Sequence, residues 1–314
     1  MKILLATPLL PPDVGGPATY SALLIDQLPR HGITVAVAYF GAVRHFPPGI
    51  RHLVYFFQLL SNSRGAKLIL ALDPVTIGFP AALAALVTRK PLVLKVVGDY
   101  AWEQGVQRFG ITELLDEFLD RKNFPFMVHV FRNIQSLVAH RARRIITPSE
   151  YLKSVVTRWG IPAEKTTVIP NGVPDLSNIG SKEVIRSLLA LRGQLIVSAG
   201  RLVPWKGFAA LIELMPKLRK KFPDTRLLIV GDGPLRGDLR QVVQREELRG
   251  HDLALVEGLV PGGHVAGQLV QRDLGLAQEQ PGAHDVAEHH QQAGRVEAHL
   301  VDVAQLLGRR HEVV

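Results

Sequence analysis

A short segment with one arginine and one lysine carries the clearest chemical signal in the sequence. The segment runs from Ser198 to Gly207 and holds the cations Arg201 and Lys206, five residues apart. It follows the apolar run Leu195–Val197, which is typical of a buried strand. A guanidinium group offers a planar pair of donors to phosphate oxygens, and an ammonium group adds a compact charge. The spacing predicts a diphosphate site, although a surface turn with two solvated cations has the same composition.

Two glycine-rich turns could bring the backbone close to phosphates. Gly15 and Gly16 follow an apolar first strand and precede a helix, and Gly231 and Gly233 occupy a similar place after Leu227–Val230. Glycine lets a backbone approach a phosphate closely, and a helix N-terminus presents N–H groups to it. The first pair is not the dinucleotide-binding GxGxxG pattern. Each turn alone also fits an ordinary connection between a strand and a helix.

Two acidic residues follow the expected strand Leu92–Val97. They are Asp99 and Glu103, and ligands in open α/β sheets bind at the carboxyl ends of strands. A carboxylate there can hydrogen-bond sugar hydroxyls or act as a general acid or base. A solvated loop carboxylate is the alternative, and it fits Glu103 better than Asp99.

The composition bounds the class of protein. The chain has 314 residues, 47% hydrophobic and 21% charged, and no cysteine. This excludes disulfides, thiol catalysis and Cys-ligated metals, and it fits a reducing compartment. The apolar run at the N-terminus is too short for a signal peptide, so we expect a cytoplasmic protein. The apolar stretch Leu68–Val87 is interrupted by Asp73, Pro74 and Pro80, which favours a strand, a loop and a buried helix over a membrane span.

The positive charge lies in the first half of the chain. Of the net +9, residues 1–170 carry +8, from 19 Lys and Arg against 11 Asp and Glu. Such a half could attract nucleic acid, an anionic membrane or an anionic substrate. No nucleic-acid motif is present. Peripheral contact with an anionic membrane remains open, although the aromatic residues also fit a core. The candidate residues are Phe124, Phe126, Phe131, Arg141, Arg143 and Arg144.

Strand and helix patterns alternate along the chain. The order predicts a parallel sheet covered by helices, and it restarts near Leu195 after the turn-rich linker Pro174–Ser181. Expected strands are Lys2–Thr7, Thr34–Phe40, Lys67–Leu72, Leu92–Val97, Arg144–Thr147, Leu195–Ala199, Arg226–Val230 and Leu253–Glu257. Expected helices are Tyr20–His31, Phe79–Thr88, Glu113–Asp120, Phe126–Arg143, Phe208–Lys221 and Leu235–Leu248.

The end of the chain has an unusual composition. No Phe, Trp or Tyr occurs from Pro223 onward and no Lys after Lys221, while seven of the 12 His lie between His251 and His311. We interpret this as a change of reading frame near residues 258–275, with a compositional fluctuation in a GC-rich genome as the alternative. His284, His289, His290 and His299 do not form a recognised metal motif, so we expect no metal site and no other cofactor.

Together the motifs resemble the GT-B glycosyltransferases of the large retaining family 4, from Met1 to about Gly258. Each motif alone is weak, but their order and spacing together are specific for this family. They are Gly15-Gly16, Thr147-Pro148-Ser149, Ile169-Pro170-Asn171-Gly172-Val173, Gly200-Arg201 with Lys206-Gly207, and Val230-Gly231-Asp232-Gly233-Pro234. The resemblance implies two Rossmann-like parallel-sheet domains facing a cleft, the second incomplete. We expect an acceptor domain at 1–175, a partial nucleotide-sugar domain at 182–258 and an aberrant tail at 259–314.

The resemblance also implies a reaction. A sugar would pass from a nucleoside diphosphate sugar to a hydroxyl of a glycan or lipid-linked acceptor, with retention and without a metal. Arg201, Lys206 and the four turn glycines would bind the donor, and the two cations would stabilise the leaving diphosphate. Asp99 would be catalytic and Glu103 would contact the acceptor.

Two departures bear on activity. Many family members have a histidine where Gly98 stands. The family's later Glu-x7-Glu motif is also missing, because no two glutamates of the tail are eight residues apart. Impaired turnover is therefore expected of this chain. A non-catalytic nucleotide-binding remnant and a GT-B-like nucleotide-sugar epimerase are the alternatives, while no cofactor-lysine motif supports a phosphorylase.

Overall fold

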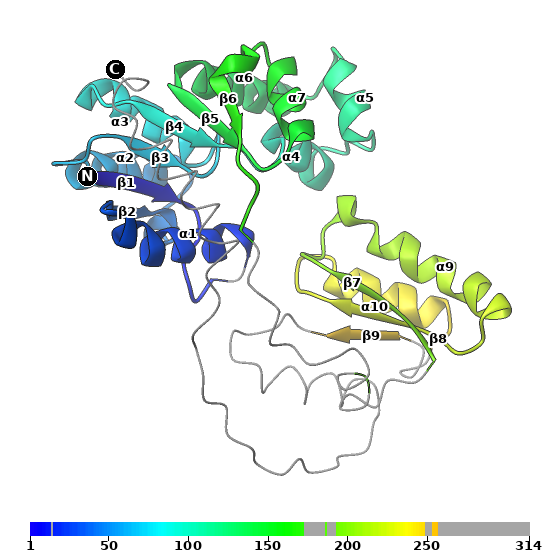
Figure 1. Ribbon diagram of the computed structural model, residues 1–314. Helices are drawn as coiled ribbons and strands as arrows, with labels where there is room; N and C mark the ends of the chain where they lie inside the picture. Colours follow the sequence, from blue (N-terminus) through cyan, green and yellow to red (C-terminus); the bar gives the residue numbers. More distant parts are fainter. Residues whose placement is uncertain (14, 173–185, 187–192, 249–252, 257–314) are drawn as a thin grey trace, which may run out of the picture. The chain divides into compact units, whose positions relative to one another are not determined.

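The structure is a computed structural model that describes residues 1–13, 15–172, 186, 193–248 and 253–256. The chain divides into two compact units, the first containing Met1–Asp175 and the second beginning at Leu176. Each unit is an α/β domain with its own sheet and its own core (Figure 1).

The first unit is built on a six-stranded parallel sheet. The strand order is β2-β1-β3-β4-β5-β6, and every neighbouring pair is parallel. The central strands consist mainly of Leu, Ile, Val and Ala and are buried on both faces, as expected for a parallel sheet covered by helices. The strands are β1 (Lys2–Thr7), β2 (Thr34–Tyr39), β3 (Ile69–Ala71), β4 (Leu92–Lys95), β5 (Arg144–Thr147) and β6 (Thr166–Val168).

The helices of the first unit pack on both faces of this sheet. Helix α3 packs against both α2 and α6, so these three form one layer, and α1 contacts β1. The connection from β1 to β2 runs along the sheet in the direction opposite to the connections from β2 to β3 and from β3 to β4. Because parallel crossovers are right-handed, α1 therefore covers the other face of the sheet (Figure 1). The helices are α1 (Gly16–Gln27), α2 (Ile50–Asn62), α3 (Gly78–Thr88), α4 (Tyr100–Arg108), α5 (Leu115–Asp120), α6 (Phe126–Arg141) and α7 (Glu150–Arg158). Short 3-10 turns stand at Leu28–His31, Phe40–Val43 and Ala163–Lys165.

The apolar stretch Leu68–Val87 forms strand β3, a loop and most of helix α3, in the predicted order. The helix is not buried as predicted, because Leu83, Leu86 and Val87 on its outer face are exposed. Asp73 begins the loop, and its Oδ1 accepts the backbone N–H of Val75 at 2.7 Å, which fixes the turn into α3. Among the residues that the structure describes, no helix has the length and apolar character needed to cross a bilayer.

The second unit is also built on a parallel sheet, but a smaller one. The prediction that Leu195–Val197 is a buried strand is wrong, because this edge strand has no buried residue and Val197 is 56% exposed. Strands β7 (Gln194–Ala199), β8 (Thr225–Val230) and β9 (Leu253–Val256) form a parallel sheet in that order. Helices α9 (Phe208–Lys221) and α10 (Arg236–Arg245) pack against each other, and α9 packs on β8. The linker residues Pro174–Ser181, the tail at 259–314 and the tail histidines lie outside the described residues.

Candidate functional site

The loop between β7 and α9 carries the two predicted phosphate-binding cations. Arg201 follows β7 by two residues, and Lys206 ends a 3-10 turn, Pro204–Lys206. Both cations are exposed, whereas Leu202 and Val203 between them are buried in the core. Gly207 adopts a left-handed conformation with φ 69° and caps α9, a geometry that glycine adopts at little cost. The buried pair anchors the loop and leaves both charged side chains to the solvent.

A second glycine-rich loop, between β8 and α10, locks the first one in place. Leu202 donates its backbone N–H to the carbonyl of Asp232 at 2.9 Å, and its own carbonyl accepts the N–H of Leu235 at 3.1 Å. A Cβ on Gly231 would lie 1.9 Å from the carbonyl oxygen of Gly200, and one on Gly233 would lie 2.5 Å from that of Leu202. Both glycines are therefore needed for close approach of two backbones. Their predicted contact with a donor stays a prediction.

One cation of this region had no signal in the sequence. Arg236 opens α10, its side chain is 17% exposed, and its Nη1 lies 3.9 Å from Oδ1 of Asp232. The pair joins the β8–α10 turn to the helix that follows. In the second unit, Arg236 thus stands beside the two loops that the sequence had singled out.

In the first unit, Gly15 and Gly16 form the entrance of α1. The carbonyl of Gly15 accepts the N–H groups of Ala18 and Thr19, at 3.0 and 3.1 Å, and so closes the first helical turn. A Cβ on Gly15 would lie 3.3 Å from Leu9, whereas the space around Gly16 is open to at least 4 Å. Of the two, Gly16 offers the access that the predicted phosphate contact requires.

Asp99 is buried and its carboxylate serves the fold. It caps α4 by accepting the N–H of Trp102 at 2.9 Å on Oδ1. Its Oδ2 accepts from Nε2 of Gln135, at 3.1 Å, and from Nε1 of Trp159, at 2.9 Å. Asp99 therefore ties α4 to α6 and to the end of α7, and it is 1% exposed. Burial raises the pKa of this carboxyl, against the opposing effect of the three hydrogen bonds and of Arg132.

The glycine that precedes Asp99 has a neighbour that the sequence could not reveal. A Cβ on Gly98 would lie 2.2 Å from Oε1 of Glu103, so the carboxylate of Glu103 occupies the place that a side chain at position 98 would need. Glu103 is half-buried, in the first turn of α4. The structure thus places the predicted acceptor-contacting acid beside the predicted catalytic loop.

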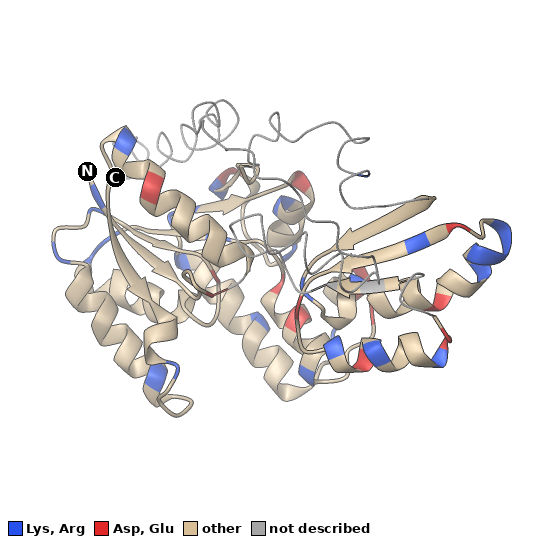
Figure 2. Cartoon of the chain, turned by 90° about the horizontal axis from the view of Figure 1, so that it is seen from below, with Lys and Arg blue, Asp and Glu red and all other residues tan. Residues whose placement is uncertain are grey.

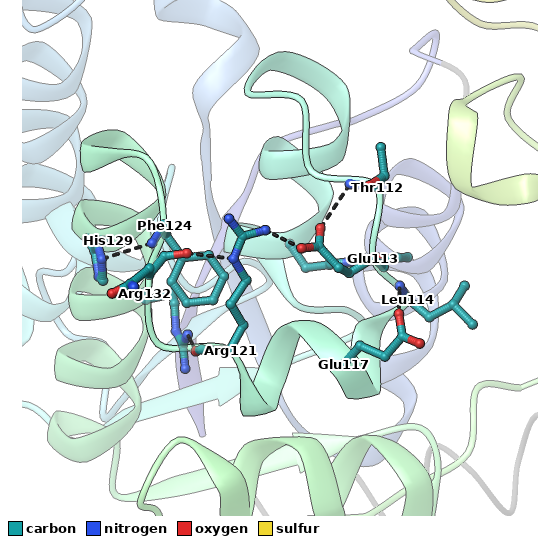
Figure 3. A network of polar contacts seen from close by, with 10 residues as sticks. Thr112, Glu113, Leu114, Glu117, Arg121, Phe124, His129 and Arg132 are labelled. Atoms are coloured by element: carbon teal, nitrogen blue, oxygen red, sulfur yellow. Dashed lines mark hydrogen bonds and ion pairs between the residues drawn. The ribbon is translucent and has the colours of Figure 1, made fainter.

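A polar network holds α5 and the following loop against α6 (Figure 3). Arg121 pairs with Glu113 and donates to the carbonyl of Asn123, and Nη1 of Arg132 donates to the carbonyl of Arg121 at 3.2 Å. The guanidinium of Arg132 stacks 4.6 Å from the Phe124 ring. Phe124 and Phe131 pack around the small core of Phe118, whereas Phe126 is 78% exposed. Two of the three aromatic residues proposed for membrane contact therefore belong to a core.

A buried amine in β4 was also missed. Lys95 is 2% exposed, its Nζ has no hydrogen-bond partner in the described structure, and this atom lies 4.1 Å from the centre of the Tyr20 ring. Burial lowers the pKa of Lys95 to about 8. The sequence signal was present, because Lys95 interrupts the otherwise apolar strand Leu92–Val97.

Two family matches cover most of the chain. Residues 38–172 match the glycosyl transferase 4-like domain, and residues 182–252 match the glycosyl transferases group 1 domain. A GDP-mannose-dependent alpha-(1-6)-phosphatidylinositol monomannoside mannosyltransferase of Mycolicibacterium smegmatis is 27% identical over 274 residues, which are 82% of this chain and 66% of the relative.

A second transferase is similar to this chain over a shorter stretch. The N-acetylgalactosamine-N,N'-diacetylbacillosaminyl-diphospho-undecaprenol 4-alpha-N-acetylgalactosaminyltransferase of Campylobacter jejuni is 31% identical over 129 residues, which are 41% of this chain. The matched part spans about a third of that relative's length, 33%.

Solved structures share the fold. Anabaena Alr3699/HepE in complex with UDP-glucose superposes with a TM-score of 0.58 at 19% identity, over 83% of this chain and 70% of that chain. Sucrose-phosphate synthase of Thermosynechococcus elongatus gives a TM-score of 0.60 at 17% identity, over 88% and 73%. The described residues accordingly have the GT-B fold, and the chain belongs to the family 4 GT-B glycosyltransferases.

Proposed function

We propose that this protein transfers a sugar from a nucleoside diphosphate sugar to a hydroxyl acceptor, with retention of the anomeric configuration. The observation that carries the proposal is the loop between β7 and α9. Its backbone is fixed by Leu202 and by the neighbouring glycine turn, while Arg201 and Lys206 extend into solvent. Solved relatives of the same fold contain UDP or UDP-glucose.

The two cations would act on the leaving group. As the bond from the sugar to the diphosphate breaks, negative charge develops on the phosphate oxygens. Donors that are already in place stabilise this charge without reorganisation. Arg201 and Lys206 fit this role, with Gly231 and Gly233 shaping the loop. No metal is required in this scheme.

The sequence predicts Asp99 as a catalytic residue and Glu103 as an acceptor-contacting residue of the first domain. The three donors on the carboxylate of Asp99 favour a positioning role, in which Asp99 fixes α4 and thereby places Glu103 over Gly98. Glu103 is then the acid that a hydroxyl group of the acceptor would meet at this edge of the sheet.

A lipid-linked acceptor is the proposed substrate class. The names of two relatives include a lipid-linked group: diphospho-undecaprenol in one and phosphatidylinositol monomannoside in the other. A protein that works on such substrates from the cytoplasm meets them at a membrane surface, so we include peripheral membrane contact in the proposal. A free glycan is the alternative acceptor, and nucleic acid is not a proposed partner.

The proposal is tested by calorimetric titration with UDP and GDP. Arg201→Ala and Lys206→Ala should each weaken binding about tenfold to a hundredfold, because one charge-assisted contact contributes roughly 1.5–3 kcal/mol. Lys217→Ala is the matched control, since it removes an exposed cation of the same domain from α9. Affinities unchanged by both site substitutions, or lowered equally by the control, would contradict the donor site.

The missing Glu-x7-Glu motif supports one alternative, a nucleotide-binding remnant without turnover. We propose that a frame change near residues 258–275 removed the motif. Sequencing the coding DNA downstream of codon 258 should reveal, in another frame, a Glu-x7-Glu segment preceded by an aromatic-containing strand. UDP binding without sugar transfer by this chain, and transfer by the repaired chain, would establish both points. Consumption of nucleotide sugar without any acceptor would instead favour an epimerase.

A further inference from the structure

The first domain contains a large cavity away from the predicted site. It has a volume of about 780 Å³ and is lined by the ends of α3 and α6, by the starts of β4 and β5, and by the segment before β6. These are the amino ends of the strands. Gly16 and Asp99 follow the carboxyl ends of β1 and β4, at the opposite edge of the sheet. The cavity is therefore separate from the proposed transfer site.

The lining of the cavity is strongly basic. Among its fourteen lining residues, the only carboxylate belongs to Glu164. The six cations are Arg89, Lys90, Arg141, Arg143, Arg144 and Lys165. Lys and Arg are spread over both domains (Figure 2), so it is their gathering around one hollow that distinguishes this region. Six cations against one carboxylate give the cavity a positive potential that attracts an anion.

The fold holds several of these cations in place. Nζ of Lys90 donates to the carbonyl of Ala66 at 2.7 Å, and Nη1 of Arg144 donates to that of Glu164 at 2.9 Å. Lys165 donates to the carbonyl of His140, and burial lowers its pKa. Arg89, Arg141 and Arg143 are exposed around this framework. The arrangement is thus an inner set of cations that donate to backbone carbonyls and an outer set that is exposed.

Two exposed apolar side chains stand at the end of helix α3. Leu86 lines the cavity and is 57% exposed, and Val87, the next residue along the helix, is 63% exposed. Apolar surface beside a basic hollow is typical of contact with a lipid bilayer. No lining residue is aromatic, which disfavours a single-stranded nucleic acid that would stack its bases.

From this combination we propose that the cavity binds the phosphate headgroup of an anionic phospholipid and seats the amino-end edge of the first sheet on a membrane. The outer cations contact phosphate, and Leu86 and Val87 enter the acyl boundary. The proposal names the surface that the proposed membrane contact uses. It rests on the proposed membrane contact but not on a lipid-linked acceptor, because the cavity lies at the edge of the sheet opposite Glu103, and it is independent of the transfer reaction.

The test is sedimentation of the full chain with vesicles. Binding should be strong to vesicles that contain phosphatidylglycerol, weak to pure phosphatidylcholine, and reduced by salt. The triple variant Arg89→Gln, Arg141→Gln, Arg143→Gln should bind the anionic vesicles about a hundredfold more weakly, about fivefold for each cation removed. Leu86→Gln with Val87→Gln should weaken binding about tenfold without changing the preference for the anionic lipid.

A matched control removes the same charge elsewhere. Lys217→Gln, Lys220→Gln, Lys221→Gln changes three exposed cations of α9 in the other domain and should leave vesicle binding within about twofold of the original. UDP affinity should be unchanged in both triple variants, so failure of the donor site would be seen separately. Equal loss of vesicle binding in both triple variants would overturn the proposal, as would binding of soluble glycerol phosphate without any vesicle binding.

Discussion

The loop after β4 and the loop after β7 use their polar residues in opposite ways. In the first, the side chain of Asp99 makes the fold, because its two oxygens accept three hydrogen bonds from three elements. In the second, backbone contacts of Leu202 make the fold, and the side chains of Arg201 and Lys206 stay exposed. Both loops follow a strand and precede a helix, although β4 is buried and β7 is not. The comparison teaches that the polar side chains of such a loop stay available to a ligand only where backbone contacts alone support the loop.

Asp99→Asn should have the largest effect on stability. An amide offers one acceptor oxygen, and its NH2 group would face Nε2 of Gln135 and Nε1 of Trp159, or the N–H of Trp102. Leaving two of these buried donors without an acceptor costs about 1–3 kcal/mol for each, so we expect a loss of about 2–6 kcal/mol. Urea unfolding of the variant checks this, with the exposed Asp26→Asn as the control. A variant that keeps its stability but loses sugar transfer would instead make Asp99 catalytic.

Lys95→Met sharpens the comparison, because Lys95 ends β4, the strand before Asp99. Unlike Asp99, its buried charged group makes no hydrogen bond in the described structure. The pKa of Lys95 falls from 10.5 to about 8, so the folded protein holds this proton less tightly than the unfolded chain does. Since the unfolded chain binds more protons between these values, the free energy of unfolding rises from about pH 8 to 10.5. The variant should lack this rise and be more stable at pH 7, by up to about 3 kcal/mol.

Urea unfolding of Lys95→Met at pH 7 and pH 10 measures both effects. The cation–π contact with Tyr20 works against the gain, by roughly 0.5–1 kcal/mol. A variant that is less stable at pH 7 would show that the contact, or a polar neighbour, outweighs the burial of the charge. Arg89→Met, which removes an exposed cation of the same domain, is the control. It keeps Lys95 and should therefore show the same rise with pH as the original protein.

Gly231→Ala tests the statement that backbone contact holds the second loop. The added methyl group would meet the carbonyl oxygen of Gly200 at 1.9 Å, so one of the two loops must move. We expect a loss of about 1–3 kcal/mol in stability, together with weaker UDP binding. Gly237→Ala is the matched control, since no atom lies within 4 Å and the residue is inside α10, where alanine is favourable. Equal stability of the two variants would contradict the interlocked loops.

Much of this architecture could be predicted from the sequence, because apolar runs and turn residues mark it directly. The strands β1 and β5 and the helix α9 have the predicted bounds. Helix α2 was not predicted, although Ile50, Leu53 and Phe57 recur at helical spacing. Its exposed apolar face departs from the pattern of an ordinary amphipathic helix, which weakens that signal.

The environments of the site residues were beyond the sequence for a physical reason. Asp99 meets Gln135 and Trp159, which lie 36 and 60 residues away, and the Gly98 backbone meets the carboxylate of Glu103 only after α4 has formed. The basic cavity likewise gathers cations from α3, α6 and β5. Residue type and local spacing predict which chemistry a side chain can perform. Long-range packing decides whether its polar atoms are already hydrogen-bonded within the fold.

Ser149→Ala should have the smallest effect, and it shows how much of the Asp99 effect is helix capping. Ser149 stands after β5, the strand beside β4, and caps α7 as Asp99 caps α4. Its Oγ accepts one hydrogen bond, from the N–H of Leu152 at 3.2 Å, so its loss should cost about 1 kcal/mol. Ser154→Ala, an exposed position inside the same helix, is the control and should be neutral or slightly stabilising. If Ser149→Ala and Asp99→Asn reduce the free energy of unfolding equally, then the bonds to Gln135 and Trp159 add nothing, and the contrast between a used and an unused side chain fails at its first example.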